Sequence, residues 1–497
     1  MFEAMSAAFE IIFAPQGLLL LIIGSSIGII FGALPGLGTI SAAALLIPLT
    51  YDMSLAHSMI LLVSTLGAAT FGGSISAILL NTPGMPVNAA TCFDGYPLTC
   101  QGKAGMALGA SATASAGGAL FSVFWLVLLV PVMFNVAVHL GPPEVFAISL
   151  IGLFMVGIVT ARDVVWKGIV SSSFGLVISF IGWNSITGNL RYTVGIKYLW
   201  DGIPLIPAII GMFAISAALG LLAKGERGKI VEQSKLEKGG VWKGIKSVFE
   251  HKWTFLRGAT IGTIIGIIPG VGGTVANFLA YVQEVEVSKN PENFGKGDIR
   301  GVIAPEAANN AKDGGAMIPT LALGVPGSPF CAVFLGAFVV HGVWPGLQLF
   351  SEHLEVIWII IFALICSNIL SSTIGIILTP LLIKVIVLPT ILIAPVVLIL
   401  SVVGVYASRQ MSGDLIMAGL FAVFAYFLQR YKFPVAALIV GFVLGPIVEN
   451  TFYQTIQIGR GSYSAFYTRP ITISVLVIGF LIILRLIIPK KGGKKIS

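Results

Sequence analysis

Residues 17–38 read GLLLLIIGSSIGIIFGALPGLG, and this stretch decides the class of fold. Its residues 17–34 carry no charge and are long enough as a helix to cross about 30 Å of hydrocarbon. Similar runs recur along the 497 residues, of which 56% are hydrophobic and 10% charged, with a mean hydropathy of +0.98. Because soluble domains carry about a quarter charged residues, a water-soluble protein is excluded. Continuous apolar runs favour helices over a β-barrel. We therefore predict an all-α polytopic membrane protein with ten or eleven spans.

The basic residues lie between the apolar runs or after the last one, so the net charge of +8 argues for membrane topology and against a nucleic-acid partner. No lysine or arginine occurs in residues 1–102, whereas nine occur in residues 224–257 and five follow Leu484. Basic loops stay in the cytoplasm, so the C-terminus is expected inside and the N-terminus outside. Met1–Gln16 has no basic residue and does not fit a secretory signal peptide, so the first span is expected to be retained.

A repeat divides the chain into two halves. Each half has a helix face of glycines that ends in Pro-Gly-x-Gly, followed by a Pro-Gly-x-Pro motif at Pro83–Pro86 and Pro326–Pro329. We expect an N-terminal membrane repeat over residues 1–223, a basic cytoplasmic linker over 224–253, and a C-terminal membrane repeat with a final span and basic tail over 254–497. The first motif recurs at an offset of 234, from Gly24, Gly28, Gly32, Pro35, Gly36 and Gly38 to Gly258, Gly262, Gly266, Pro269, Gly270 and Gly272.

The glycines and the prolines of this motif have different explanations. Glycine at every fourth position lets membrane helices approach closely. Proline removes a hydrogen-bond donor and glycine loosens the backbone, so Pro-Gly predicts an interruption at membrane depth. Residues 254–268 with 272–283, and 17–34 with 39–50, are then expected as re-entrant hairpins that open to opposite sides. This arrangement gives the inverted repeats with broken helices of many secondary transporters. The alternative is that the prolines only kink helices for packing.

The second motif combines a break with polar neighbours and indicates a binding site. Proline at the start of a half-helix leaves the following N–H groups unpaired, and such a positive end attracts carboxylates. No lysine or arginine lies at the centre of these segments, so an anion is expected to be held by helix ends, hydroxyls and amides. The predicted substrate-binding residues are Pro35, Gly36, Gly38, Thr39, Asn81, Thr82, Pro83, Gly84, Pro86, Asn88, Pro269, Gly270, Gly272, Thr274, Pro326, Gly327, Ser328 and Pro329.

The same breaks are expected to bind a coupling cation, because freed carbonyls with serine and asparagine oxygens suit a hard ion such as sodium. Glu306, Asn309, Asn310 and Asp313 fall on one helix face. That face is either solvated at the membrane surface or a cation-coordinating or gating stripe. No metal centre and no cofactor beyond this cation are expected. The candidate coupling-ion residues are Ser74, Ser76, Asn309, Asn310 and Asp313.

Other functional classes fit less well. Gly24–Gly28 matches the G-x-S-x-G pattern of serine hydrolases, but its glycines belong to the glycine face, and no enzyme is expected. No P-loop motif is present, so the chain does not itself hydrolyse ATP. The four cysteines fit small apolar packing residues, with a Cys92–Cys100 disulfide as the alternative. An ion or solute channel with a Gly/Pro-rich filter is the alternative to a transporter.

Five motifs follow one another along nearly the whole chain: Gly32–Gly38, Leu80–Gly84, Pro269–Gly272, Pro305–Ala311 and Gly315–Ser328. In this order they resemble the large membrane subunit of the tripartite tricarboxylate transporters. The resemblance implies a bacterial inner-membrane carrier that works with a small membrane subunit and a periplasmic solute-binding protein. It also implies uptake of carboxylates such as citrate, driven by a cation gradient, with sodium favoured over protons. Lys312 and Asp313 depart from the small residues expected there in the family.

The sequence thus predicts a symporter that works by alternating access. One repeat pair is expected to move relative to a scaffold formed by the other spans, and an elevator-type motion is one form of such a movement.

Overall fold

The computed structural model describes residues 1–160, 164–184, 186–224, 239–269, 272–386 and 390–487, and it is mostly helical. One short antiparallel hairpin, β1 (Gly182–Trp183) and β2 (Leu190–Arg191), is present in these residues. The helices are α1 (Phe2–Phe13), α2 (Pro15–Ala33), α3 (Gly38–Leu46), η1 (Ile47–Thr50), α4 (Leu55–Leu80), η2 (Pro86–Asn88), α5 (Cys92–Cys100), α6 (Ala104–His139), α7 (Pro142–Thr160), α8 (Val165–Ser179), η3 (Lys197–Leu199), α9 (Leu205–Ile210), η4 (Gly211–Ile215), α10 (Ser216–Lys224), α11 (Gly240–Glu250), α12 (Lys252–Ile267), α13 (Gly272–Val287), η5 (Pro291–Asn293), α14 (Arg300–Leu323), α15 (Pro329–Val340), α16 (Leu347–Glu352), α17 (Leu354–Ile386), α18 (Thr390–Arg409), α19 (Ser412–Arg430), α20 (Val435–Ile458), α21 (Ser464–Thr468) and α22 (Pro470–Ile487).

Within the described residues, eight helical segments are long and apolar enough to cross a membrane. The prediction of a multi-pass α-helical membrane protein is confirmed, but the number is below the ten or eleven spans expected. The difference arises because apolar runs such as 165–179 and 329–340 form helices of fewer than 18 residues. The eight segments are α2, α4, α6, α9 with α10, α17, α18, α19 and α20.

The chain folds into two compact units, and each unit contains segments from both sequence halves. Unit 1 comprises residues 1–135 and 204–426, and unit 2 comprises residues 136–203 and 427–497.

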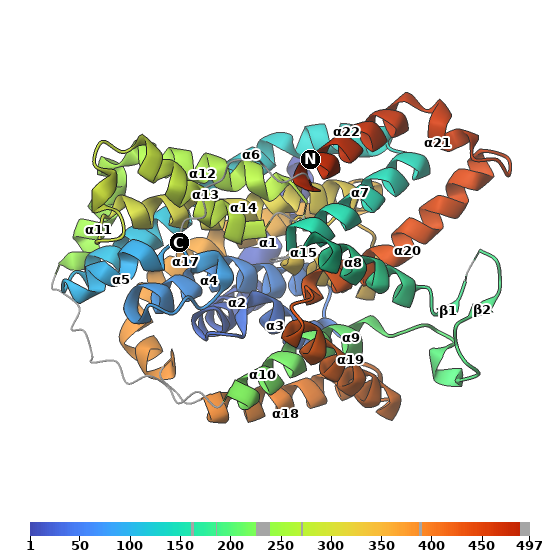
Figure 1. Ribbon diagram of the computed structural model, residues 1–497, viewed down its shortest axis with the longest axis horizontal. Helices are drawn as coiled ribbons and strands as arrows, with labels where there is room; N and C mark the ends of the chain where they lie inside the picture. The colour runs from blue at the N-terminus through green and yellow to red at the C-terminus, as the bar shows by residue number, and fades with distance from the viewer. Residues whose placement is uncertain (161–163, 185, 225–238, 270–271, 387–389, 488–497) are drawn as a thin grey trace. The chain divides into compact units, whose positions relative to one another are not determined.

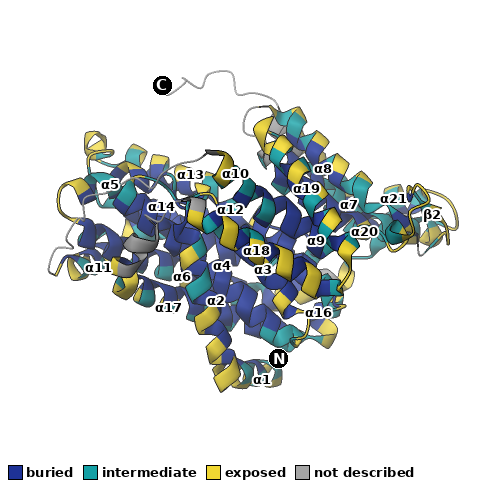
Figure 2. Cartoon of the chain, turned by 90° about the horizontal axis from the view of Figure 1, so that it is seen from below, coloured by how far each residue is buried: buried dark blue, intermediate teal, exposed yellow. Residues whose placement is uncertain are grey.

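Helices α4 and α14 form the core of unit 1. Residues 58–79 of α4 and 301–317 of α14 are buried without interruption, and Figure 2 shows α4 in dark blue. In Figure 1, α12 and α13 lie beside α14, and both helices contact it. The face that carries Glu306 and Asp313 is therefore not a solvated face at the membrane surface. It is buried because other helices cover α14 on all sides.

Glycines bring α2 onto α4 and α12 onto α14. A Cβ atom added at Gly28 would lie 2.4 Å from the Thr65 carbonyl oxygen, and one at Gly262 would lie 2.2 Å from that of Ala308. The close-packing explanation of the glycine faces is therefore confirmed. The register is constant in each half: Gly24, Gly28 and Gly32 face the carbonyls of Leu61, Thr65 and Ala69, and Gly258, Gly262 and Gly266 face those of Ala304, Ala308 and Lys312.

The long helices α6 and α17 pack against the two core helices, α4 and α14. Gly67 of α4 packs against Ser367 and Asn368 of α17, and Gly118 of α6 packs against the Ala307 carbonyl of α14. In the expected linker, the described residues from Gly239 onward form α11, whose Gly244 packs against the backbone of α6.

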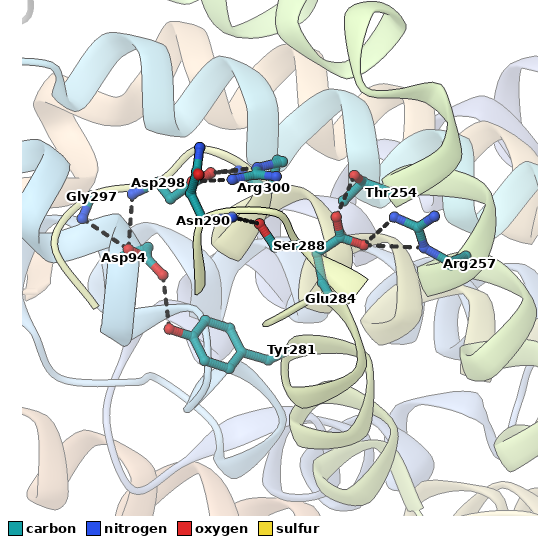
Figure 3. A network of polar contacts seen from close by, with 10 residues as sticks. All are labelled: Asp94, Thr254, Arg257, Tyr281, Glu284, Ser288, Asn290, Gly297, Asp298 and Arg300. Atoms are coloured by element: carbon teal, nitrogen blue, oxygen red, sulfur yellow. Dashed lines mark hydrogen bonds and ion pairs between the residues drawn. The ribbon is translucent and has the colours of Figure 1, made fainter. Parts of the chain in front are cut away.

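A polar network fixes the loop before α14 to α5 (Figure 3). Asp94 of α5 is buried, accepts the Tyr281 hydroxyl at 2.9 Å and accepts the backbone N–H groups of Gly297 and Asp298 at 2.8 and 2.9 Å. Partial burial alone would raise the pKa of Asp298, but hydrogen bonds and charge from Arg300 outweigh it and lower the pKa below its ordinary value. This pair therefore stabilises the loop at neutral pH and is lost as the pH falls through that pKa.

Unit 2 is built on α20, which packs against α7 and α8. At one end, Lys167 Nζ donates to the Tyr431 carbonyl at 2.8 Å. In the segment that follows α8, Arg191 forms a two-bond ion pair with Glu449 at 2.6 and 3.0 Å, which holds the β1–β2 hairpin to α20.

All four cysteines of the chain are free thiols. The alternative of a Cys92–Cys100 disulfide is therefore wrong, and two of the four, Cys92 and Cys331, are buried as small packing residues.

Gly262→Leu is expected to destabilise the protein, because a side chain would force α12 away from the Ala308 carbonyl. Overpacking of this kind costs about 1–3 kcal/mol. The measurement is the temperature at which half of the detergent-solubilised protein stays monodisperse in size-exclusion chromatography. Gly419→Ala in α19 is the control, since a Cβ atom there meets nothing within 4 Å. An unchanged midpoint for Gly262→Leu would contradict the packing argument.

Asp94→Ala is expected to release the loop of residues 288–299, because two partly buried N–H donors and one buried hydroxyl lose their acceptor. Each unsatisfied donor costs about 1–3 kcal/mol. Trypsin should then cleave faster at Lys289 and Lys296, while Tyr281→Phe, which removes one bond, should have a smaller effect. Asn290→Ala serves as the control, because only the backbone of Asn290 makes the hydrogen bond drawn in Figure 3. Equal cleavage rates in Asp94→Ala and wild type would show that the network does not hold the loop.

Candidate functional site

The two Pro-Gly-x-Gly motifs lie where helices end, as predicted. α3 begins after residues 34–37, and α13 begins after residues 268–271, of which Gly270 and Val271 lie outside the described residues. The first residues of the new helices, Gly38 and Gly272, have φ of 70° and 73°. This left-handed conformation suits glycine, because a Cβ atom would clash there. Both helix interruptions are therefore confirmed.

The second break of each half also ends a long helix. Asn81 follows α4 with φ of 52°, and Gly324 follows α14 with φ of 66°. In the second half a new helix begins at once, because Ser328 caps α15 by accepting the Cys331 N–H at 3.3 Å, and Pro329 is the first helical residue. The expected helix start after this break is confirmed.

The first half differs from the expectation at this point. Its break is followed by η2, a helical turn of only three residues that starts at Pro86, and the next α-helix begins at Cys92. One short turn aligns too few peptide dipoles to act as a positive helix end. Pro83 therefore does not begin a half-helix.

Segments from the two halves meet beside these breaks. A Cβ atom added at Gly273, the second residue of α13, would lie 2.9 Å from Val87 Cγ1 of η2 and 2.6 Å from Lys312 Cε of α14. The Thr39 hydroxyl of α3 lies 3.0 Å from Met85 Sδ. α3 also contacts α15, and η2 contacts α13. Each half thus places a segment that follows a break against a segment that follows a break in the other half.

The predicted substrate-binding residues do not all lie at this meeting point. The N–H groups of Gly84 and Gly327 donate to the Gly73 carbonyl and the Thr320 hydroxyl of the helix that precedes each break. The Thr82 hydroxyl donates to the Leu80 carbonyl. Gly36, Asn81 and Pro86 are exposed, Pro35, Gly38, Thr82, Pro83, Pro269, Gly272, Thr274 and Pro329 are half-buried, and Thr39, Gly84, Asn88, Pro326, Gly327 and Ser328 are buried.

Asn88 joins this meeting point to the core of unit 1. Its side chain is fully buried, and its Nδ2 donates to the Thr70 carbonyl at 2.9 Å and to Ser74 Oγ at 2.7 Å on α4. Its Oδ1 is buried without a hydrogen-bond partner among the described residues. Ser74 in turn donates to Glu306 at 2.7 Å, and the Thr70 hydroxyl donates to Asp313 at 3.3 Å. A chain of hydrogen bonds therefore connects two buried carboxylates of α14.

The candidate coupling-ion residues divide into four environments. Ser74 and Asp313 belong to the chain of hydrogen bonds just described. Asn310 faces α17 and donates to Asn368 Oδ1 at 2.6 Å, whereas Ser76 bonds to the Gly73 carbonyl of its own helix. Both polar atoms of the Asn309 side chain are buried without a partner in the described part of the chain. The structure thus groups Ser74 with Asp313 and separates them from Asn310 and Ser76.

Lys312 is a site residue that the sequence reading of the breaks missed. Among the described residues it is the only buried lysine or arginine, and its ammonium is bonded to Asp313. Its methylene groups run across Gly273, where α13 begins. The signal was visible as a charge within a run of small residues, but only the packing of α13 on α14 shows that the charge reaches a helix break.

The arrangement combines one buried ammonium group with oxygen atoms of hydroxyls, amides and carboxylates that can coordinate a cation. A cation at a helix start favours a carboxylate ligand, because the ammonium and the free N–H groups both present positive charge. The oxygen donors, in contrast, suit a hard cation. The site therefore offers separate surroundings for an anion and for a cation.

Comparison with known proteins agrees with these features. The family model described as "Tripartite tricarboxylate transporter TctA family" matches residues 18–440. An uncharacterized 52.8 kDa protein in the TAR-I ttuC' 3' region of Agrobacterium vitis is 31% identical over 491 residues, which cover 99% of this chain and 97% of that protein. A second uncharacterized protein, in the TAR-II ttuC' 3' region of the same organism, is 33% identical over 234 residues, 47% of this chain and 97% of that protein. The chain belongs to the TctA family of tripartite tricarboxylate transporters.

Proposed function

We propose that this transporter component imports a small carboxylate, a tricarboxylate or a related organic acid, across the bacterial inner membrane. The observation that carries the proposal is the position of Lys312, a buried ammonium that lies where α13 begins and beside η2. A carboxylate that reaches this place would exchange the hydrogen bonds of water for the ammonium and for N–H groups at the start of α13.

Asp313 makes the site reversible. Because it is already bonded to Lys312, the ammonium is not left buried without a counter-charge when no substrate is bound, which would cost several kcal/mol. A substrate carboxylate then competes with Asp313 for the ammonium. The free-energy difference between the substrate-bound and the substrate-free site therefore stays small. A carrier needs this in order to release its substrate.

Cation symport with alternating access is the mechanism we propose, with sodium favoured over protons. The halves 1–223 and 254–497 would act as inverted repeats joined by the basic segment 224–253. The proposal is supported by the constant glycine register in α2–α4 and α12–α14, and by equivalent contacts at the second breaks. There, a Cβ atom at Gly84 would lie 2.8 Å from Gly73, and one at Gly327 would lie 2.6 Å from Ala316. An elevator-type motion is compatible with this scheme.

The partners we propose are the small membrane subunit and the periplasmic solute-binding protein that complete a tripartite carrier. Membership in a family of tripartite transporters supports them. The proposed topology has the N-terminus in the periplasm and the C-terminus in the cytoplasm. In unit 2, Lys167 lies against Tyr431, between Arg430 and Lys432, and this concentration of basic residues supports a cytoplasmic end.

The function is tested by reconstituting the chain with its partner subunits in liposomes and by screening radiolabelled carboxylates with and without a sodium gradient. Saturable uptake of one acid or a few related acids that depends on the gradient is expected. Conductance without saturable uptake would contradict the proposal and indicate a channel. Uptake that saturates with neutral solutes but not with carboxylates would also overturn it.

Lys312→Met is expected to lower kcat/KM for carboxylate uptake at least about tenfold, which corresponds to about 1.4 kcal/mol. Since this change leaves Asp313 without its cation, the double variant Lys312→Met/Asp313→Asn is measured as well. It should fold like wild type and still fail to take up carboxylates. Lys103→Met, at an exposed position, is the matched control. If the double variant has the KM of wild type, Lys312 does not take part in substrate binding.

A further inference from the structure

Glu306 differs from the other buried acidic residues of the protein. Six acidic side chains are buried in the described part of the chain. Four of them form ion pairs with a basic residue, and Asp94 accepts two backbone N–H groups and a tyrosine hydroxyl. Glu306 is fully buried, and its partners among the described residues are hydroxyl groups alone. Its charge therefore has no fixed counter-charge in this part of the chain.

Four hydroxyls from three parts of the chain converge on this carboxylate. Oε2 accepts Ser74 of α4 at 2.7 Å and accepts Ser111 and Ser115 of α6, both at 2.9 Å. Oε1 accepts Thr91, which lies between η2 and α5, at 2.5 Å. Five oxygen-bearing side chains thus surround one point in the interior of unit 1.

The hydrogen bonds favour the ionised form of Glu306. Ser74 Oγ accepts the Asn88 amide and lies 2.7 Å from Glu306 Oε2 but 3.3 Å from the Thr70 carbonyl, so the Ser74 proton points at the carboxylate. Distances of 2.5 and 2.7 Å for Thr91 and Ser74 are those of hydroxyls that donate to an anion. A neutral carboxyl group would have to donate to one of the four hydroxyls, which would then have to turn its own proton away.

A bound cation would offset the cost of an ionised carboxylate in this position. Hydroxyl groups distribute its charge but do not cancel it, and a buried charge without a partner is costly. One carboxylate with several neutral oxygens matches a hard monovalent cation, because a divalent ion would leave an excess positive charge. Softer metals prefer histidine and cysteine, whereas the groups bonded to Glu306 in the described part of the chain are hydroxyl oxygens.

We propose that Glu306, Ser74, Thr91, Ser111 and Ser115 form a sodium-binding site. As the site of the coupling ion, the cluster rests on the proposed function. As a cation site, it stands on the side chains alone. The sequence placed Glu306 on a face that was a possible cation-coordinating stripe, but it did not group Glu306 with Thr91, Ser111 and Ser115, because these hydroxyls lie 191 to 215 residues away along the chain.

The sodium site is connected to the proposed anion site by the hydrogen bonds described above. From Glu306 they run through Ser74, Asn88 and Thr70 to Asp313, which holds Lys312. Thr91 belongs to the segment that follows η2. Val87, a residue of η2, lies beside Gly273 and Lys312. A cation that orders Thr91 and Ser74 therefore also orders the walls of the anion site, and the effect is reciprocal by thermodynamic linkage.

The test measures sodium binding directly, without transport. The purified chain in detergent is melted in NaCl, KCl or choline chloride at equal ionic strength, and the midpoint of unfolding is followed against concentration. Sodium is expected to stabilise wild type more than the other two cations do, by binding the folded state. In Glu306→Gln, the sodium concentration for half-maximal stabilisation should rise at least about tenfold.

A second variant and two controls keep the result interpretable. Ser111→Ala/Ser115→Ala removes two oxygens and leaves Glu306 in place, so it should weaken sodium stabilisation even if Glu306→Gln does not fold. Ser122 lies on α6, as Ser111 and Ser115 do, and its hydroxyl donates to the Ala119 carbonyl. The control variant Ser122→Ala should therefore behave like wild type. Glu449→Gln, an acidic residue of unit 2 paired with Arg191, is the charge control and should keep the sodium response.

The outcomes separate this site from the proposed function. Equal stabilisation of wild type by sodium and choline, or an unchanged sodium response in both site variants, would overturn the sodium site. Carboxylate uptake by the reconstituted system could still persist in that case. Conversely, sodium stabilisation that is lost in the site variants supports the site even if the reconstituted system takes up no carboxylate.

Discussion

The close approach of glycine to backbone carbonyls is the constraint on which unit 1 depends. α2 lies against α4, and α12 against α14, with no room for a Cβ atom at the contacting glycines. Such close contact gains dispersion energy and lets polar backbone groups face one another at positions where lipid could not satisfy them. Each long helix of the core is thereby held along its length before it ends at a break.

The second breaks are stabilised because several of their backbone N–H groups find hydrogen-bond partners within the protein. Residues 82–85, 89–91 and 324–328 have irregular backbone, and unpaired N–H and C=O groups at membrane depth would each cost several kcal/mol in hydrocarbon. Here the N–H of Gly84 finds the Gly73 carbonyl, that of Gly327 finds the Thr320 hydroxyl, and Ala90 donates to Asn277 Oδ1. The polar side chains beside the breaks therefore have a structural purpose as well as the proposed binding roles.

The sequence predicts much of this architecture and little of its polar interior. Hydropathy and the Pro-Gly motifs locate the long helices and all four interruptions, because both depend on local residue properties. The local sequence pattern predicted a half-helix at Pro83, but the chain forms the short turn η2 there. Contacts of Val87 with α13 and of Asn88 with α4 set this turn, and such contacts cannot be predicted from a local pattern. For the same reason the sequence left open whether the face of Glu306 is solvated or coordinates a cation, and it did not predict the burial of Lys312. A charged face on a helix looks solvated until the helices that cover it are known.

The constant register of the two halves has one further consequence. Gly32 meets the carbonyl of Ala69, and its counterpart Gly266 meets that of Lys312, so a methyl group in one half occupies the place that an ammonium occupies in the other. A scaffold repeated in this way would offer a ligand two equivalent poses if both places held the same residue. With positive charge on one side alone, the proposed anion, if its ends differ, would meet unlike surroundings, which would select one of the two poses.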